Sequence, residues 1–214
     1  METLAMVTPL PATSGPRRER ALGMTLHSLD GRHRLEVSGP LPPGWFGAMS
    51  HGLAGLGFNI RRASGRRDSR GHWRAEIAFT APLGGPEVAG VDFRGLLTRP
   101  RGPRGGPALV LDSWMLAGPM VDGALVLSVV GRDCVGFLAS LLDLLALFSV
   151  FPQEIAIETE GAVVRDRFVL RGLGGRRPSD KACEALRRSL DELVVSRSTP
   201  DRTVAPDNSP DSRG

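Results

Sequence analysis

The chain has 214 residues, of which 41% are hydrophobic and 23% are charged, and its formal net charge is +4. This length allows one large domain or two small ones, and the apolar fraction is sufficient for a packed core. Acids and bases nearly balance, so the charge gives little support for a strongly basic nucleic-acid-binding protein. Cys134 and Cys183 stand far apart in no metal-ligand spacing. We therefore expect no metal, no cofactor and no oxidising compartment.

Both ends of the chain predict disorder. Residues 1–23 and 199–214 are rich in Pro, Gly and polar residues, which is typical of a disordered arm and a disordered tail. The arm lacks the basic start and long apolar segment of a secretory signal, so we expect a cytoplasmic protein. Between the ends we expect two folded units, at 24–118 and 119–198, with a linker at 100–107 that reads PRGPRGGP.

In the first unit, apolar periodicity and turn residues predict an alternation of strands and helices. A strand ending at Gly39 precedes a helix that begins near Trp45, and Asn59 starts the next strand. A polar hairpin loop, a partner strand and a short helix follow, and the segment at 107–116 can close this unit's sheet. The expected elements are a strand at 33–39, a helix at 45–57, a loop at 65–71, a strand at 72–81, a helix at 90–99 and a strand at 107–116.

The second unit contains the most apolar stretch of the chain, VGFLASLLDLLALFSVF at 135–151. A membrane span needs about 20 apolar residues, and Asp143 stands in the middle of this shorter run. The pattern favours a helix with an apolar face broad enough to pack on its own sheet and on a second neighbour. Pro152 is expected to break the chain before the next strand. The expected elements are a strand at 124–133, this helix, strands at 153–159 and 162–172, a helix at 179–194 and a short strand at 194–196.

The two halves repeat one order of elements at a constant offset, which relates Leu35 to Leu127, Gly44 to Gly136 and, with the same spacing, Leu53 to Leu145. The predicted fold class is therefore α+β: two ferredoxin-like βαββαβ sandwiches in tandem, each an antiparallel sheet with its helices on one face.

Particular residues resemble the ACT domain, the small-molecule regulatory module of amino-acid metabolism. The family often shows Asp-Arg-Pro-Gly-Leu-Leu before its first helix, and here the segment from Asp133 to Leu138 reads DCVGFL. The hairpin IETEGAVVRDRFVL, with Asp166 and Phe168, is similar to those in the ACT modules of uridylyltransferases that modify nitrogen-signalling proteins. In the first unit, LAGLGFNI at 53–60 resembles the family's helix end and second strand.

The resemblance implies a small ligand, an amino acid or a similar molecule, bound where two modules meet. A glycine loop at a helix start can present backbone N–H groups to a carboxylate, and Asp133 could take an ammonium group. The implied ligand-binding residues are Gly44, Trp45, Asn59, Asp133, Gly136 and Phe137. The first unit has Leu41 in place of the acid, and the second has Phe151 in place of the Asn. Either the half-sites complement each other, or both have decayed.

The same residues also have simpler, purely structural interpretations. Gly44 and Gly136 could serve only as turns, Asp133 could cap its helix, and Asn59 could satisfy a strand end. Cys134 lies near a helix start, where a thiol pKa can be lowered. The arginines of one hairpin favour a solvated loop over an anion-binding or nucleic-acid-binding patch: Arg61, Arg62, Arg66, Arg67 and Arg70.

No catalytic arrangement is recognisable in the sequence, so we do not expect an enzyme. We expect a regulatory protein that binds a small molecule and controls a partner enzyme or signalling protein. A homodimer is compatible with the pattern. Two alternatives remain: an RNA-binding module, since RNA-recognition motifs share the strand order, and a ligand-free interaction scaffold. We expect no membrane partner.

The breadth of the second unit's apolar helix predicts how the units meet. We expect the helical layers of two units to pack together, with sheets that can join edge to edge. The loops at Gly44 and Gly136 should then lie near the seam between the units, and Asp133 and Asn59 should serve one composite site or two related ones. Glycines in the first helix, Gly52, Gly55 and Gly57, suggest close approach of a bulky neighbour.

Overall fold

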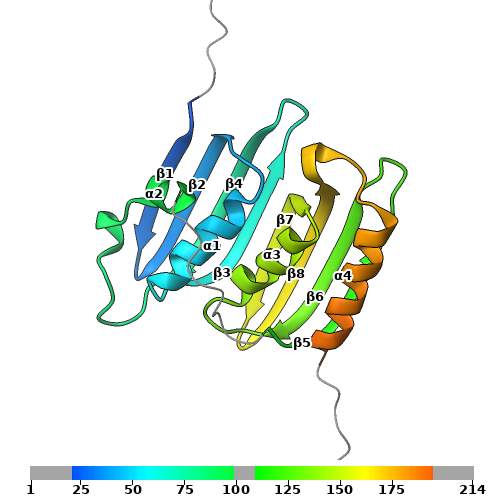
Figure 1. Ribbon diagram of the computed structural model, residues 1–214. Helices are drawn as coiled ribbons and strands as arrows, with labels where there is room; N and C mark the ends of the chain where they lie inside the picture. Colours follow the sequence, from blue (N-terminus) through cyan, green and yellow to red (C-terminus); the bar gives the residue numbers. More distant parts are fainter. Residues whose placement is uncertain (1–20, 99–108, 195–214) are drawn as a thin grey trace, which may run out of the picture.

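The computed structural model describes residues 21–98 and 109–194, which form one antiparallel sheet with its helices on one face (Figure 1). The expected tail, the linker at 100–107 and most of the expected arm lie outside these residues. The sheet order is β1-β2-β4-β3-β7-β8-β6-β5. The strands are β1 Gly23–Leu29, β2 Arg32–Pro40, β3 Asn59–Arg67, β4 His72–Thr80, β5 Leu111–Ala117, β6 Leu125–Arg132, β7 Val150–Glu160 and β8 Val163–Gly172. The helices are α1 Trp45–Gly55, α2 Phe93–Thr98, α3 Phe137–Leu147 and α4 Asp180–Leu193, with short 3₁₀ turns at Val88–Gly90 and Leu173–Gly175.

The sheet divides into two ferredoxin-like halves, as the repeat predicts. β1 to β4 form the first half with α1 and α2, and β5 to β8 form the second half with α3 and α4. All neighbouring strands run antiparallel. The predicted fold class of two tandem α+β sandwiches is confirmed.

The edge strands differ from the expected assignment. The segment at 107–116 was expected to close the first sheet, but β5 pairs with β6 of the second half, with Trp114 opposite Val129. The fourth position of the first sheet is filled by β1, which was not among the expected strands. A tight turn at Asp30 and Gly31, with φ of 49° and 72°, joins β1 to β2. Asp-Gly is a strong hairpin signal, so this strand was recognisable. The strand expected at 194–196 is a single bridge from Val194 to Leu111; residues 195 and 196 lie outside the described chain.

The apolar run at 135–151 forms a shorter helix than expected. α3 ends at Leu147, and Ser149 turns the chain at φ 56° directly into β7. Pro152 therefore lies inside a strand and not between two elements. A bulge follows it, and the ladder to β3 begins only at Glu154. A proline is tolerated there because it lies beside a bulge and before the point where the ladder to β3 begins.

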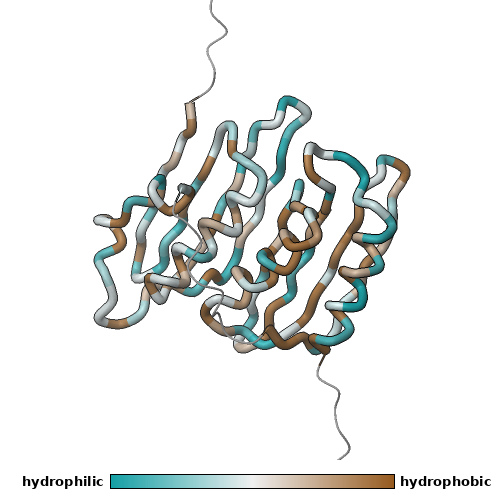
Figure 2. The backbone as a smooth tube through the Cα atoms, viewed as in Figure 1, coloured by the Kyte–Doolittle hydropathy of each residue, from teal (hydrophilic) through white to brown (hydrophobic). Residues whose placement is uncertain are grey.

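One core runs under both halves. In the first half it is built on the buried stripe of α1 and the inner face of β2 and β4; in the second, α3 and α4 cover β6 and β8. Figure 2 shows α3 as hydrophobic along most of its length, whereas α4 mixes hydrophobic and hydrophilic residues. The fully buried side chains include Met49, Leu53, Ile77, Leu127, Leu141, Leu145, Phe168 and Leu186. The halves are therefore not independent bodies on a flexible linker.

The two halves meet about an approximate two-fold axis. β3 pairs with β7, and Ser64 stands opposite Ala156, its equivalent at the offset that relates Leu35 to Leu127. In the helical layer, His51 of α1 lies 2.7 Å (Nε2 to Oδ2) from Asp143 of α3. These two residues are equivalents at the same offset. The predicted packing of the helical layers and the edge-to-edge joining of the sheets are both confirmed.

The explanation offered for the α1 glycines is only partly right. A Cβ on Gly52 would lie 2.8 Å from the side chain of Leu96, so a bulky neighbour does require glycine there. That neighbour belongs to α2 of the same half and not to the other half. Gly55 has nothing within 4 Å of a Cβ, and Gly57 follows the helix at φ 75°, where glycine is favoured by the backbone alone.

Candidate functional site

The strand-to-helix loops at Gly44 and Gly136 lie at the seam between the halves. Both glycines adopt left-handed backbone, with φ of 80° and 93°, and neither helix start receives a hydrogen bond from a side-chain cap. The conformation explains why glycine precedes each helix. Because no side chain caps the start of α3, Asp133 is not the N-cap of this helix. Each loop lines a cavity whose other walls include residues of the opposite half.

Beside Gly136, the polar residues bind one another. Asp133 Oδ2 accepts hydrogen bonds from Asn59 Nδ2 at 2.9 Å and from Arg61 Nη1 at 2.6 Å. Arg61 Nη2 also donates to the carbonyl oxygen of Gly161 at 3.1 Å. The Asp133 side chain is 10% exposed. The predicted meeting of Asn59 and Asp133 is confirmed as geometry, and their role in ligand binding stays a prediction.

The space behind this cluster, here called the Gly136 cavity, is small. It has a volume of about 20 Å³ and is lined by Asp133, Gly136, Phe137, Ser50 and Asp166, among others. A water molecule needs about 10–15 Å³ measured in this way, so the cavity has room for about one water. It is too small for an amino acid.

Two buried polar atoms border the Gly136 cavity without a hydrogen-bond partner in the described chain: Ser50 Oγ and Asp166 Oδ1. Burial raises the pKa of Asp166 to about 8; the backbone N–H of Glu158 opposes the shift and the charge of Asp133 adds to it. Asp166 is therefore predominantly protonated at neutral pH.

The thiol of Cys134 does not behave as the helix-start argument suggested. Desolvation, followed by the negative charge of Asp133, raises the pKa of Cys134, although the backbone N–H of Phe137 opposes the shift. A raised pKa disfavours the thiolate and makes this cysteine less reactive.

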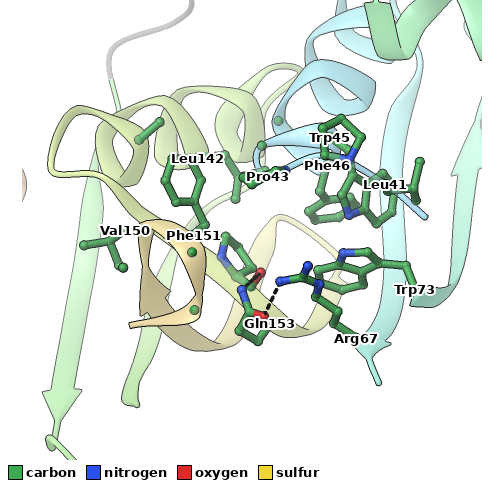
Figure 3. A pocket seen from close by; sticks show the side chains of 18 residues that line it. Leu41, Pro43, Trp45, Phe46, Arg67, Trp73, Leu142, Val150, Phe151 and Gln153 are labelled. Carbon is green, nitrogen blue, oxygen red and sulfur yellow. Dashed lines mark hydrogen bonds between the residues drawn. The ribbon is translucent and has the colours of Figure 1, made fainter. Parts of the chain in front are cut away.

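The equivalent space beside Gly44, here called the Gly44 cavity, is larger. Its volume is about 120 Å³. Its walls come from the loop and first turn of α1, the ends of β3 and β4, one side of α3, the start of β7 and the loop after β8 (Figure 3). The lining residues are Leu41, Pro42, Pro43, Gly44, Trp45, Phe46, Gly47, Arg67, Trp73, Leu142, Ala146, Val150, Phe151, Pro152, Gln153, Gly172, Gly174 and Gly175.

The polar side chains of the Gly44 cavity offer mainly donors. Arg67 is half-buried, with Nη1 donating to Gln153 Oε1 at 3.3 Å and Nε to the carbonyl oxygen of Gly71 at 3.2 Å (Figure 3). Trp45 is buried, and its indole N–H has no hydrogen-bond partner in the described chain. The lining contains no acidic side chain. This cavity is therefore suited to an apolar ligand that carries a hydrogen-bond acceptor or a negative charge.

The implied ligand-binding residues fall into two groups. Gly44 and Trp45 line the Gly44 cavity, whereas Asp133, Gly136 and Phe137 line the Gly136 cavity, with Asn59 bound to Asp133. The structure does not bring all six residues to one space. It forms two equivalent sites across the two-fold axis.

Sequence reasoning missed three side chains that shape these sites. The sequence pattern predicts a solvated loop for Arg61 and Arg67 and indicates no role for Gln153. Arg61 and Gln153 are the extra residues of bulges at equivalent points of β3 and β7. A bulge re-aims a side chain and leaves no simple sequence signature. Arg67 was detectable, because strand alternation places it on the same face as the buried Ala63.

Other observations bear on the alternatives. Among the strand aromatics, Trp73, Phe79 and Phe168 are buried, so these three cannot stack on a nucleotide base, whereas Trp114 of β5 and Phe151 of β7 are half-buried. The described residues contain no group of His, Cys, Asp and Glu that could hold a metal ion. No described helix is long and apolar enough to cross a membrane.

No family model matches this sequence, and no curated protein matches it. Among solved structures, the chain is similar to the crystal structure of aspartate kinase from Synechocystis, at 17% sequence identity and a TM-score of 0.44. The match covers 76% of this chain and 27% of the kinase chain, so this chain spans about a quarter of that protein. No functional conclusion follows from so distant a likeness.

Proposed function

We propose that this chain is a non-catalytic regulatory protein that binds an amino acid or a similar small carboxylate between two ACT-like halves and thereby controls a partner protein. The observation that carries the proposal is the Gly44 cavity, which lies between the start of α1 in one half and the start of β7 in the other. This is the place that the resemblance to ACT domains implied for a ligand.

The chemistry of the lining supports binding and gives no support to catalysis. The lining contains no Asp, Glu, His, Cys, Ser or Lys, so it offers none of the usual groups for general acid–base or nucleophilic chemistry. A ligand here would also contact both halves at once. Binding would then favour one relative position of the halves, and a partner could sense that change.

The proposal is tested by thermal unfolding in the presence of each standard amino acid and of each corresponding carboxylate without the amine. A ligand that binds only the folded state stabilises it by about 2.7 kcal/mol at 100 times its Kd. For a domain of this size we expect the Tm to rise by roughly 5–10 °C. A flat response across both sets, with calorimetry in agreement, would contradict the proposal.

A matched pair of variants locates the binding. Ala146 of α3 lines the Gly44 cavity, and its two-fold equivalent Ala54 of α1 lines the Gly136 cavity; both are half-buried. We expect Ala146→Leu to fill the Gly44 cavity and abolish the ligand-induced shift. Ala54→Leu should retain it. Loss of the shift in both variants, or in neither, would place the ligand elsewhere.

A further inference from the structure

The two seam sites are equivalent in position and different in chemistry. At the constant offset between the halves, Leu41 of the Gly44 cavity corresponds to Asp133 of the Gly136 cavity, and Phe151 corresponds to Asn59. The bulged Gln153 corresponds to the bulged Arg61. The Gly136 site therefore has an acid, an amide and a guanidinium at these three positions, whereas the Gly44 site has apolar side chains at two of them.

The Gly136 site is filled by its own side chains. Asp133 is the group that could bind an ammonium, but its Oδ2 already accepts from Asn59 and Arg61 at 2.9 and 2.6 Å. A ligand's ammonium would have to displace a charged guanidinium that is held at hydrogen-bond distance on two sides. With about 20 Å³ behind the cluster, the site has no space for the rest of the ligand.

The Gly44 cavity has the space and lacks the acid. A ligand ammonium placed there would lose its hydrating water and would find no carboxylate to pair with, which is unfavourable. A ligand carboxylate would find the guanidinium of Arg67, which is half-buried and makes no ion pair with any acid in the described chain. The remaining walls are largely leucine, proline, valine and aromatic side chains. The volume of the Gly44 cavity, about 120 Å³, is slightly smaller than the volume of about 150 Å³ of a protein cavity that binds benzene.

Resting on the proposed function, we propose that the Gly44 cavity binds a small apolar monocarboxylate that carries no α-ammonium group, with its branched or single-ring tail among the apolar walls and its carboxylate at Arg67. The equivalent Gly136 site is closed by the Asn59–Asp133–Arg61 cluster and takes no ligand. The protein then discriminates a deaminated acid from the amino acid of the same carbon skeleton, because only the former has all its charged groups paired.

The test is isothermal titration of the full chain with two matched pairs of probes. Isocaproate has the skeleton of L-leucine without the amine, and hydrocinnamate has that of L-phenylalanine without the amine. We expect each acid to bind at least about tenfold more tightly than its amino acid, because the ammonium is desolvated without a partner. The neutral amide of isocaproate should also bind at least about tenfold more weakly than the acid, because it loses the charge-assisted bond.

Arg67→Gln should reduce the affinity for isocaproate at least about tenfold, whereas Arg66→Gln, at an exposed position beside it, should leave the affinity unchanged. Thermal unfolding without ligand checks that Arg67→Gln remains folded. Ala146→Leu provides a second variant that blocks the same cavity without touching the arginine.

The outcomes separate the two proposals. If the amino acids bind as tightly as the acids, this inference is overturned and the proposed function stands. If the acids bind but neither Arg67→Gln nor Ala146→Leu weakens them, the assignment to the Gly44 cavity is overturned. If neither acids nor amino acids of any kind bind, the proposed function fails and this inference fails with it.

Discussion

Replacing Asp166 by asparagine should remove a pH-dependent loss of stability. The side chain is 3% exposed on the inner face of β8, and burial raises its pKa from an ordinary 3.8 to about 8. Between these values the unfolded chain releases the proton and the folded chain keeps it. The free energy of unfolding must then fall as the pH rises, and the loss is complete only above the folded pKa.

The size of the effect follows from the shift. Each pH unit in this window removes about 1.4 kcal/mol, so the contribution of Asp166 falls by roughly 4 kcal/mol between pH 5 and pH 8. That is a large share of a typical stability of about 5–15 kcal/mol. The asparagine side chain in Asp166→Asn would have the same shape, would stay neutral, and could still accept the backbone N–H of Glu158. The free energy of unfolding of Asp166→Asn should therefore increase steadily relative to that of the wild type as the pH rises.

The assay is urea unfolding of both proteins at pH 5, 6, 7 and 8, with the difference in free energy of unfolding plotted against pH. Taking the difference cancels the titration of groups that are common to both proteins. Asp112→Asn, at an exposed position of β5, controls for the simple loss of a carboxylate. If the free energies of unfolding of the wild type and of Asp166→Asn change in parallel between pH 5 and pH 8, burial does not raise the pKa of Asp166 and the prediction is wrong.

Two further predictions use matched pairs of variants. Gly52→Ala should lower the free energy of unfolding by about 1–3 kcal/mol through the clash with α2, whereas Gly55→Ala should be neutral or stabilising by up to about 1 kcal/mol; equal effects in thermal unfolding would show that α1 adjusts freely. Arg61→Ala should destabilise by about 1–3 kcal/mol, because Asp133 keeps its burial and loses a charged donor. Arg62→Ala breaks only an exposed ion pair and should change stability by less than about 1 kcal/mol; similar losses in urea unfolding would contradict the assignment of the Asp133 cluster.

Most of the fold was predictable because it repeats. The constant offset predicts the order of elements in both halves. The resemblance to ACT domains, with the expected seam between the units, placed Asn59 and Asp133 at one composite site or two related ones although 74 positions separate them in the chain. β1 was also predictable, since Asp30 and Gly31 have the residue types that a tight hairpin requires. The pairing of β5 was not, because a strand between two similar sheets has the same alternation whichever sheet it joins.

The candidate sites were less predictable than the fold, for a physical reason. Whether an acid and an amide form an open site or satisfy each other depends on distances of a few tenths of an ångström, which residue spacing does not determine. The decisive side chains, Arg61 and Gln153, are aimed by bulges, and a bulge depends on how two strands register and not on the residue that it displaces.

The residues on the two-fold axis show what a tandem chain permits. In a symmetric homodimer, a residue on the axis faces its own copy, so a histidine would meet a histidine and an aspartate would meet an aspartate. Here the equivalent positions carry His51 and Asp143, which lie 2.7 Å apart and form a complementary pair. The same freedom lets Leu41 stand where the other half has Asp133. Joining the halves in one chain therefore allows complementary contacts on the axis and two unlike sites beside it, which identical subunits in a symmetric dimer could not provide.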